Sequence, residues 1–124
     1  MAESDLSPEE LAQQSNKRFQ DFVDAIIEFK KPIAALVNGP AIGIGVTHLP
    51  LCDFVWASDA AYFVTPFTKL GLTPEGCSSY TFPKILGPSM ANEMLMTNAK
   101  FTAHDVNMLG DFFSSYILFV SIKL

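Results

Sequence analysis

Hydrophobic positions divide the chain into one long amphipathic segment followed by a series of short apolar runs. In the first segment, apolar side chains recur every three or four positions, which predicts a helix with one apolar face. This stripe comprises Phe19, Phe22, Val23, Ile26 and Ile27. Ser7 is the expected N-cap, Pro8 takes the first turn, and Glu10 stands at the capping-box position. Because Pro32 disfavours a helical residue before it, we expect the helix to end within residues 29–31.

The short apolar runs after Pro32 predict an α/β arrangement. Residues 33–37 are apolar without alternation, as in a strand buried on both faces. Residues 53–57 (DFVWA) and 61–65 (AYFVT) predict two more strands around a Ser58-Asp59 turn. Short helices are expected at 44–51, 78–85, 89–97 and 102–109, with a loop at 73–76. This order, αβαββααα, leaves no room for an eight-unit barrel, and the sequence shows no internal repeat.

Composition narrows the possible functions. The chain has 124 residues, enough for one domain, and 49% of them are hydrophobic. Its net charge of −5 and the lack of a basic stripe argue against nucleic acid as a ligand. The two cysteines give neither a disulfide framework nor metal-ligand spacing. Because the N-terminus is acidic and polar, we expect no secretory signal, and no apolar run reaches the roughly 18 residues of a membrane span.

A glycine-rich loop follows the first predicted strand, in residues 30–45 (KKPIAALVNGPAIGIG). A strand that leads through such a loop into a helix exposes backbone N–H groups. Both phosphate-binding patterns fail on spacing: a P-loop counted from Gly39 would need glycine at Ile44, and a dinucleotide fingerprint counted from Gly43 would need it at His48. Two interpretations remain open. The loop holds a smaller group such as a carbonyl oxygen, or its glycines only permit a tight turn.

Three motifs carry a resemblance to a known family: KPIAALVNGPAIG, CDFVWAS and FVTPFTKLGLTPEG. Within residues 31–110 the chain resembles the crotonase, or enoyl-CoA hydratase/isomerase, superfamily. TPEGCSSYTFPKI is most similar to peroxisomal-type Δ3-Δ2-enoyl-CoA isomerases, and the chromodomain Y proteins are near relatives. The resemblance implies repeated ββα units and acyl-CoA thioester substrates, with coenzyme A as part of the substrate and no separate cofactor or metal. It also implies a trimer in complete relatives.

The resemblance also implies roles for individual residues. Glu75, in the Pro-Glu-Gly turn, is the expected proton-transferring base, and the backbone N–H of Ile44 is the expected oxyanion donor. Substrate contacts are expected from Ala41, Gly43, Gly45, Leu72 and Pro74. The apolar residues beside Glu75, including Cys77, predict a dry setting for its carboxylate. Related hydratases orient water with two glutamates; Thr47 and Phe67 occupy those positions, which favours isomerisation over hydration.

The chain departs from the family pattern at both ends, so we expect a partial crotonase-like fold. The sequence divides into a helical segment (1–30), a crotonase-like core (31–110) and an atypical apolar tail (111–124). Residues 1–30 lack the family segment with the second oxyanion donor, whose loss costs about 2.7–4 kcal/mol, so low activity is expected. The alternative function is a non-catalytic acyl-CoA-binding or interaction module. Relatives imply a peroxisome or mitochondrion, but Ile122-Lys123-Leu124 is not a convincing signal, and a cytoplasmic location stays open.

Overall fold

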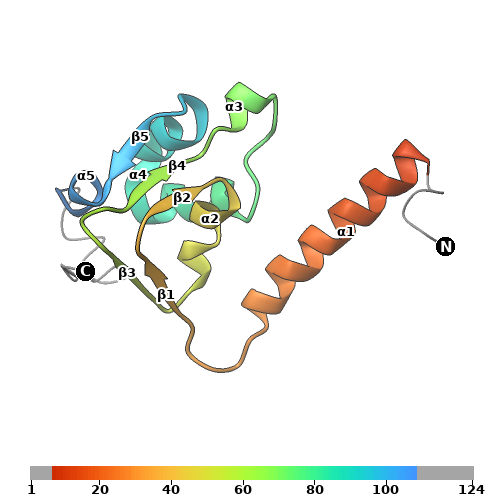
Figure 1. The fold of residues 1–124 in the computed structure, drawn as a ribbon, viewed down its shortest axis with the longest axis horizontal. Helices are drawn as coiled ribbons and strands as arrows, with labels where there is room; N and C mark the ends of the chain where they lie inside the picture. The colour runs from red at the N-terminus through yellow and green to blue at the C-terminus, as the bar shows by residue number, and fades with distance from the viewer. Residues whose placement is uncertain (1–6, 109–124) are drawn as a thin grey trace. The chain divides into compact units, whose positions relative to one another are not determined.

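The computed structural model describes residues 7–108, and its chain divides into two compact units, residues 1–30 and 31–124. The first unit is helix α1 (Pro8–Ile27; Figure 1). Its start confirms the predicted capping box: the Ser7 hydroxyl accepts from the Glu10 N–H at 3.3 Å, and the Glu10 carboxylate accepts from the Ser7 N–H at 2.8 Å. The helix ends at Ile27 with Glu28 as its C-cap, slightly before the predicted end.

Five short strands in the described part of the second unit form two sheets (Figure 1). In the first sheet, β1 (Ala34–Val37) pairs in parallel with β3 (Phe54–Ala57). In the second, β2 (Pro40–Ile42) pairs in parallel with β4 (Tyr62–Val64), and β4 pairs antiparallel with β5 (Lys100–Thr102). The unit is therefore an α/β fold in which the first four strands alternate between the two sheets and β5 joins β4 in the second.

Helices lie between these strands and after the last of them. They are α2 (Ile44–Thr47), the 3-10 helix η2 (Leu49–Leu51), α3 (Phe67–Leu70), α4 (Ser78–Met96) and α5 (Ala103–Met108). Helix α4 is interrupted at Gly87, which has φ 75° and ψ 160° and precedes Pro88. The interruption separates two helical parts and confirms the two helices predicted there.

The expected ββα units are present twice. Strands β1 and β2 lead into α2, and strands β3 and β4 lead into α3 (Figure 1). The first strands of the two units pair with each other, as do the second strands. The sequence shows no repeat because paired positions differ in side chain: Ala34 is opposite Phe54, and Leu36 is opposite Trp56. The two ββα units therefore have the same backbone topology but different side chains at corresponding positions.

Several local predictions were wrong. Strand β1 is not buried on both faces, because its residues alternate between exposed and half-buried and Leu36 is 69% exposed. Strands β2 and β5 were missed, since each has only three residues and β2 begins at Pro40. The helix predicted at 44–51 is two short helices, and α3 was not predicted. The predicted tail, residues 111–124, lies outside the described residues.

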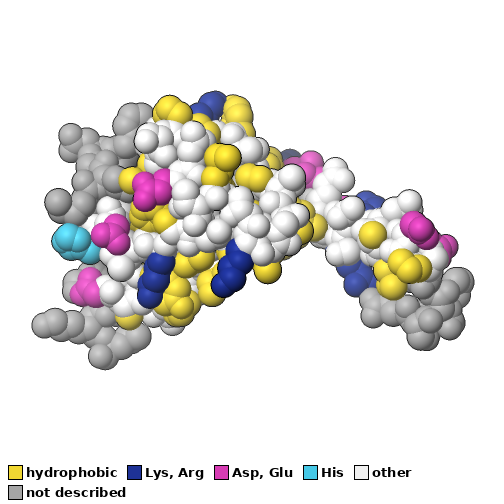
Figure 2. Space-filling model, turned by 90° about the horizontal axis from the view of Figure 1, so that it is seen from above, with side chains coloured by type: hydrophobic (Ala, Val, Ile, Leu, Met, Phe, Trp, Pro, Cys, Tyr) yellow, Lys and Arg dark blue, Asp and Glu magenta, His cyan; other side chains and the backbone are white. Residues whose placement is uncertain are grey.

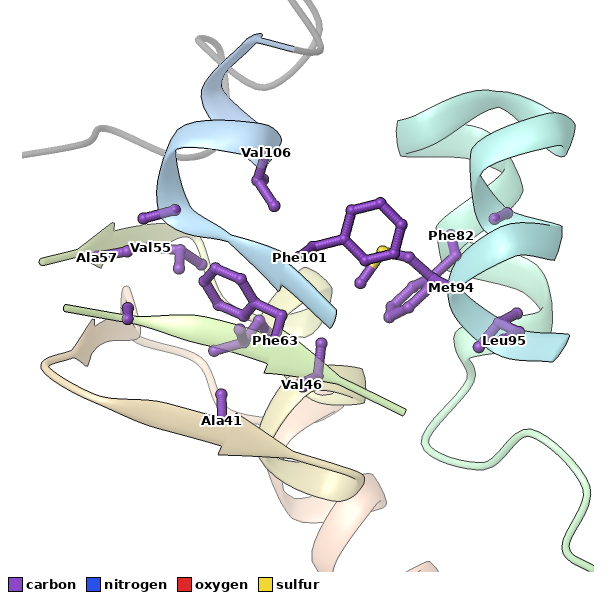
Figure 3. Close-up of a cluster of buried hydrophobic side chains, with 14 of the residues drawn as sticks. Ala41, Val46, Val55, Ala57, Phe63, Phe82, Met94, Leu95, Phe101 and Val106 are labelled. Atoms are coloured by element: carbon purple, nitrogen blue, oxygen red, sulfur yellow. The ribbon is translucent and has the colours of Figure 1, made fainter. Parts of the chain in front are cut away.

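The hydrophobic core lies between the sheets and the helices of the second unit. Figure 3 shows Phe63 of β4 and Phe101 of β5 near Phe82 and Met94 of α4, with aliphatic side chains around them. The Thr65 hydroxyl, just after β4, donates to the Met94 carbonyl of α4 and joins these layers. Other large apolar side chains are exposed, among them Phe54 (51%), and hydrophobic side chains are visible on the face in Figure 2.

Candidate active site

Helix α2 begins directly after Gly43, whose φ of 56° suits glycine better than other residues. The Gly43 N–H donates to the Val64 carbonyl of β4 at 2.9 Å, and its carbonyl accepts from the N–H groups of Val46 and Thr47. Ile44 is the first residue of α2, so its N–H has no acceptor within the helix. Because α2 has only four residues, its dipole is small, and Ile44 offers one N–H donor rather than a strong positive helix end.

The turn that carries Glu75 is fixed by the start of α4. The Ser78 hydroxyl donates to the Glu75 carbonyl oxygen at 2.6 Å, and the Ser78 N–H donates to the same oxygen at 3.1 Å. Ser78 is completely buried. Gly76 and Cys77, between these two residues, have φ of 60° and 63°. The backbone of Glu75 is therefore fixed by two hydrogen bonds.

Gly76 brings this turn against α2. A Cβ at position 76 would lie 3.0 Å from Thr47 Cβ and 3.1 Å from Ile44 Cδ1, and it would overlap the Thr47 hydroxyl. Ile44 and Thr47 are three residues apart on a helix and share one face. The residue after the expected base thus packs on the residue whose N–H is the expected oxyanion donor. The structure brings together two elements that are thirty residues apart in the sequence.

The apolar neighbours of Glu75 do not form the dry setting that the sequence predicted. Glu75 is half-buried, but Leu72 is 54% exposed, and Pro74 and Cys77 are also exposed. The buried residue of this turn is instead Gly76, which packs against α2. The expected contacts of Leu72 and Pro74 with a substrate stay predictions.

The other expected substrate-binding residues lie on both sides of the start of α2. A Cβ on Gly43 or Gly45 would meet no atom within 4 Å, so both glycines border open space in the described chain. Ala41 is different, because it is 7% exposed and belongs to the hydrophobic core opposite Phe63 of β4. Contact of these three residues with a substrate remains a prediction.

His48 is held within the same helical segment, with Nδ1 2.6 Å from the Ile44 carbonyl oxygen. Within residues 7–108, no group of three or more His, Cys, Asp or Glu side chains is arranged to bind a metal. No helix in the same range is long and apolar enough to cross a membrane.

An apolar cavity of about 280 Å³ lies away from the turn. Its walls come from α2, η2, β3, β4, α4 and α5 and include Val46, Leu49, Val55, Phe82, Leu86 and Val106. Neither Glu75 nor Ile44 lines it. Cys52 is in its wall, and burial, together with the charge of Asp53, raises the pKa of the Cys52 thiol. The cavity is therefore separate from the groups that would transfer a proton.

Comparison with known proteins decides the family. The family model for enoyl-CoA hydratase/isomerase matches residues 2–112. The chain belongs to this crotonase-type family. The match begins well before residue 31, so it includes helix α1, which the motifs of residues 31–110 did not reach.

Two curated human relatives are informative. Enoyl-CoA delta isomerase 2 is 53% identical over 110 residues, which are 86% of this chain and 28% of that protein. Chromodomain Y-like protein 2 is 59% identical over 91 residues, 73% of this chain and 18% of that protein. The chain thus spans less than a third of either relative.

Solved structures agree with the fold. An enoyl-CoA hydratase from Polaromonas matches with a TM-score of 0.77 and 31% identity, over 93% of this chain and 42% of that one. An enoyl-CoA hydratase/isomerase from Pseudoalteromonas atlantica matches with a TM-score of 0.69 and 43% identity, over 72% and 36%. The α/β arrangement of this chain is therefore a part of the crotonase fold.

Sequence reasoning missed the two residues that position the turn. Thr47 was considered only as the place where a hydratase would carry a glutamate, and Ser78 was considered only as the start of a helix. A hydroxyl residue directly after a turn is a recognisable signal, because it can bond the turn's carbonyl. The packing of Thr47 on Gly76 has no such signal, since it depends on tertiary structure.

Proposed function

We propose that this chain carries the proton-transfer centre of an enoyl-CoA isomerase, which moves a double bond of an acyl-CoA from position 3 to position 2. Glu75 takes a proton from carbon 2, between the thioester and the double bond. The electron pair left behind delocalises through the diene onto the thioester oxygen, and the Ile44 N–H stabilises that charge. Glu75 then returns the proton to carbon 4, and the double bond lies between carbons 2 and 3.

The contact of Gly76 with the side chains of Ile44 and Thr47 supports this proposal, because it brings the turn of Glu75 against the helix whose first N–H is the proposed donor. A base and an oxyanion donor must act on the same few atoms of the substrate. The open space at Gly43 and Gly45 leaves room for a thioester beside that donor. Coenzyme A enters as part of the substrate, and the proposed chemistry uses no metal or further cofactor.

Isomerisation is favoured over hydration by the residues at positions 47 and 67. A hydratase of the expected kind needs carboxylates at positions 47 and 67. Thr47 is fully buried against Gly76, and Phe67 is a fully buried core residue. Neither side chain activates water, so one carboxylate, Glu75, is left to move a proton.

The test is the conversion of a 3-enoyl-CoA to the conjugated 2-enoyl-CoA, followed by absorbance. Only one oxyanion donor is identified in the described residues. We therefore expect turnover about 10²–10³ below that of a relative with two donors. Glu75→Gln should abolish this turnover, whereas Glu93→Gln, which changes an exposed glutamate of α4, should leave it intact. Equal turnover in the wild type and Glu75→Gln contradicts the proposal.

A second candidate function is binding of acyl-CoA without turnover. It is suggested by the 59% identity over 91 residues to chromodomain Y-like protein 2, beside the 53% identity over 110 residues to the isomerase. Calorimetric titration with an acyl-CoA separates the candidates. Binding that is unchanged by Glu75→Gln, with no isomerisation by the wild type, supports a binding module.

A further inference from the structure

We infer that Thr47 and Ser78 are positioning residues for Glu75, acting from opposite sides of its turn. The inference rests on the proposed function, because it assigns the precision of the proton transfer to these two side chains. Neither residue is proposed to touch the substrate. Both act through the backbone of residues 75 and 76.

Ser78 fixes one side of the turn. Its hydroxyl and its N–H both donate to the Glu75 carbonyl oxygen, at 2.6 and 3.1 Å. Because Ser78 is fully buried, its hydroxyl is shielded from solvent. Loss of the hydroxyl leaves a single, longer bond to the same carbonyl, so the peptide that carries Glu75 gains freedom to rotate.

Thr47 fixes the other side by shape. It is fully buried, and its hydroxyl has no hydrogen-bond partner among the described residues. The side chain nevertheless lies against Gly76 so closely that a Cβ there would overlap the hydroxyl. Its contribution is therefore packing and not hydrogen bonding. Valine, which has the same shape, should replace it, whereas alanine should leave a gap beneath the turn.

The two contacts together determine where the Glu75 carboxylate lies relative to the Ile44 N–H. Thr47 and Ile44 belong to the same helix face, and both reach Gly76. A turn that loses either support can move away from α2. Because a displacement of about 1 Å can cost 10²-fold in rate, a loosened turn should lower kcat while substrate affinity is retained.

The kinetic test compares four variants of the whole chain. Thr47→Ala and Ser78→Ala should each lower kcat by about 10- to 100-fold with little change in KM. Thr47→Val should retain the wild-type kcat. Thr81→Val is the matched control, because it removes another α4 hydroxyl that donates to a turn carbonyl, that of Cys77 at 3.2 Å, without touching Glu75. If Ser78→Ala does not fold, Ser78→Cys, with its weaker donor, replaces it.

A second readout needs no turnover and separates this inference from the proposed function. In NMR spectra, the Ile44 amide resonance should shift when the pH is lowered, and Glu75→Gln should abolish that shift. Thr47→Ala and Ser78→Ala should reduce it by at least half, whereas Thr47→Val and Thr81→Val should preserve it. An unchanged shift in the two alanine variants, or no shift in the wild type, overturns the inference. If the shift behaves as expected but the wild type has no isomerase activity, the proposed function fails and the positioning role stands.

Discussion

Gly76 and Thr47 lie in direct contact, with no room for a side chain between the Pro-Glu-Gly turn and helix α2. The nearest atoms to a Cβ placed on Gly76 are the hydroxyl oxygen and Cβ of Thr47, followed by Ile44 Cδ1 at 3.1 Å. Gly76 also has φ of 60°, which other residues adopt at a cost. Both facts make glycine at this position a condition for bringing Glu75 to α2.

The first prediction is that Gly76→Ala destabilises the fold. The left-handed backbone and the overlap with Thr47 each contribute, for a total of about 2–4 kcal/mol. Urea unfolding measures the difference. Gly39→Ala is the control, because a Cβ there meets no atom within 4 Å and the backbone is not in the left-handed region. The double variant Gly76→Ala with Thr47→Ala should recover part of the loss. A Gly76→Ala protein as stable as wild type contradicts the packing described here.

The second prediction uses two fully buried threonines with different hydrogen bonding. The Thr47 hydroxyl has no partner among the described residues, whereas the Thr65 hydroxyl donates to the Met94 carbonyl. Thr47→Val should raise the free energy of unfolding by about 1 kcal/mol, because it removes an unsatisfied polar atom. Thr65→Val should lower the free energy of unfolding by about 1–3 kcal/mol, because it leaves a buried carbonyl without its donor. If both variants change the free energy of unfolding in the same direction, the hydrogen bonding described for Thr47 and Thr65 is contradicted.

The long amphipathic helix was the part of the fold most open to prediction from sequence. Ser7, Pro8 and Glu10 act locally, within one turn of α1, and the structure confirms their roles. The regions of α2 and α4 were also predicted from a local feature of the sequence, their apolar runs. Strands β2 and β5 were missed because three residues carry too little periodicity, and their pairing with β4 comes from distant parts of the chain.

The candidate site was predictable only in part, for the same physical reason. The identities of Glu75 and Ile44 came from a resemblance of motifs, which is a local property of the sequence. The contact between the turn of Glu75 and α2 depends on how Gly76 packs on Thr47, and the burial of each side chain depends on the whole fold. The predicted dry setting failed at Leu72 and Cys77 because apolar character does not decide which side of a turn faces solvent.

The third prediction concerns the two thiols. Cys77 is exposed, whereas Cys52 is half-buried and its pKa is raised by burial and by the charge of Asp53. Since the thiolate is the reactive form, Cys77 should react first with a disulfide reagent at pH 8, and Cys52 should follow more slowly. Asp53→Asn should speed the reaction of Cys52 by removing the negative charge. Mass spectrometry of the labelled peptides identifies the order, and faster labelling of Cys52 in the wild type contradicts the prediction.

The last prediction concerns the acid side of the stability profile. Hydrogen bonds from the Thr102 hydroxyl and from its N–H, at 2.6 and 2.8 Å, lower the pKa of the Asp105 carboxyl below its ordinary value of 3.8. The Asp105 N–H donates back to the Thr102 hydroxyl at 3.1 Å, so the pair caps the start of α5.

A lowered pKa in the folded state means that Asp105 stabilises the fold above its unfolded pKa and stops doing so as pH falls through the folded value. The wild type should therefore exceed Asp105→Asn in free energy of unfolding at pH 7, and the difference should shrink as the pH falls below about 4. Urea unfolding at several pH values measures it. In a Thr102→Val background, which lacks the hydroxyl, the pH dependence of this difference should be weaker. A difference between the two proteins that stays constant from pH 7 to pH 2 contradicts the cap.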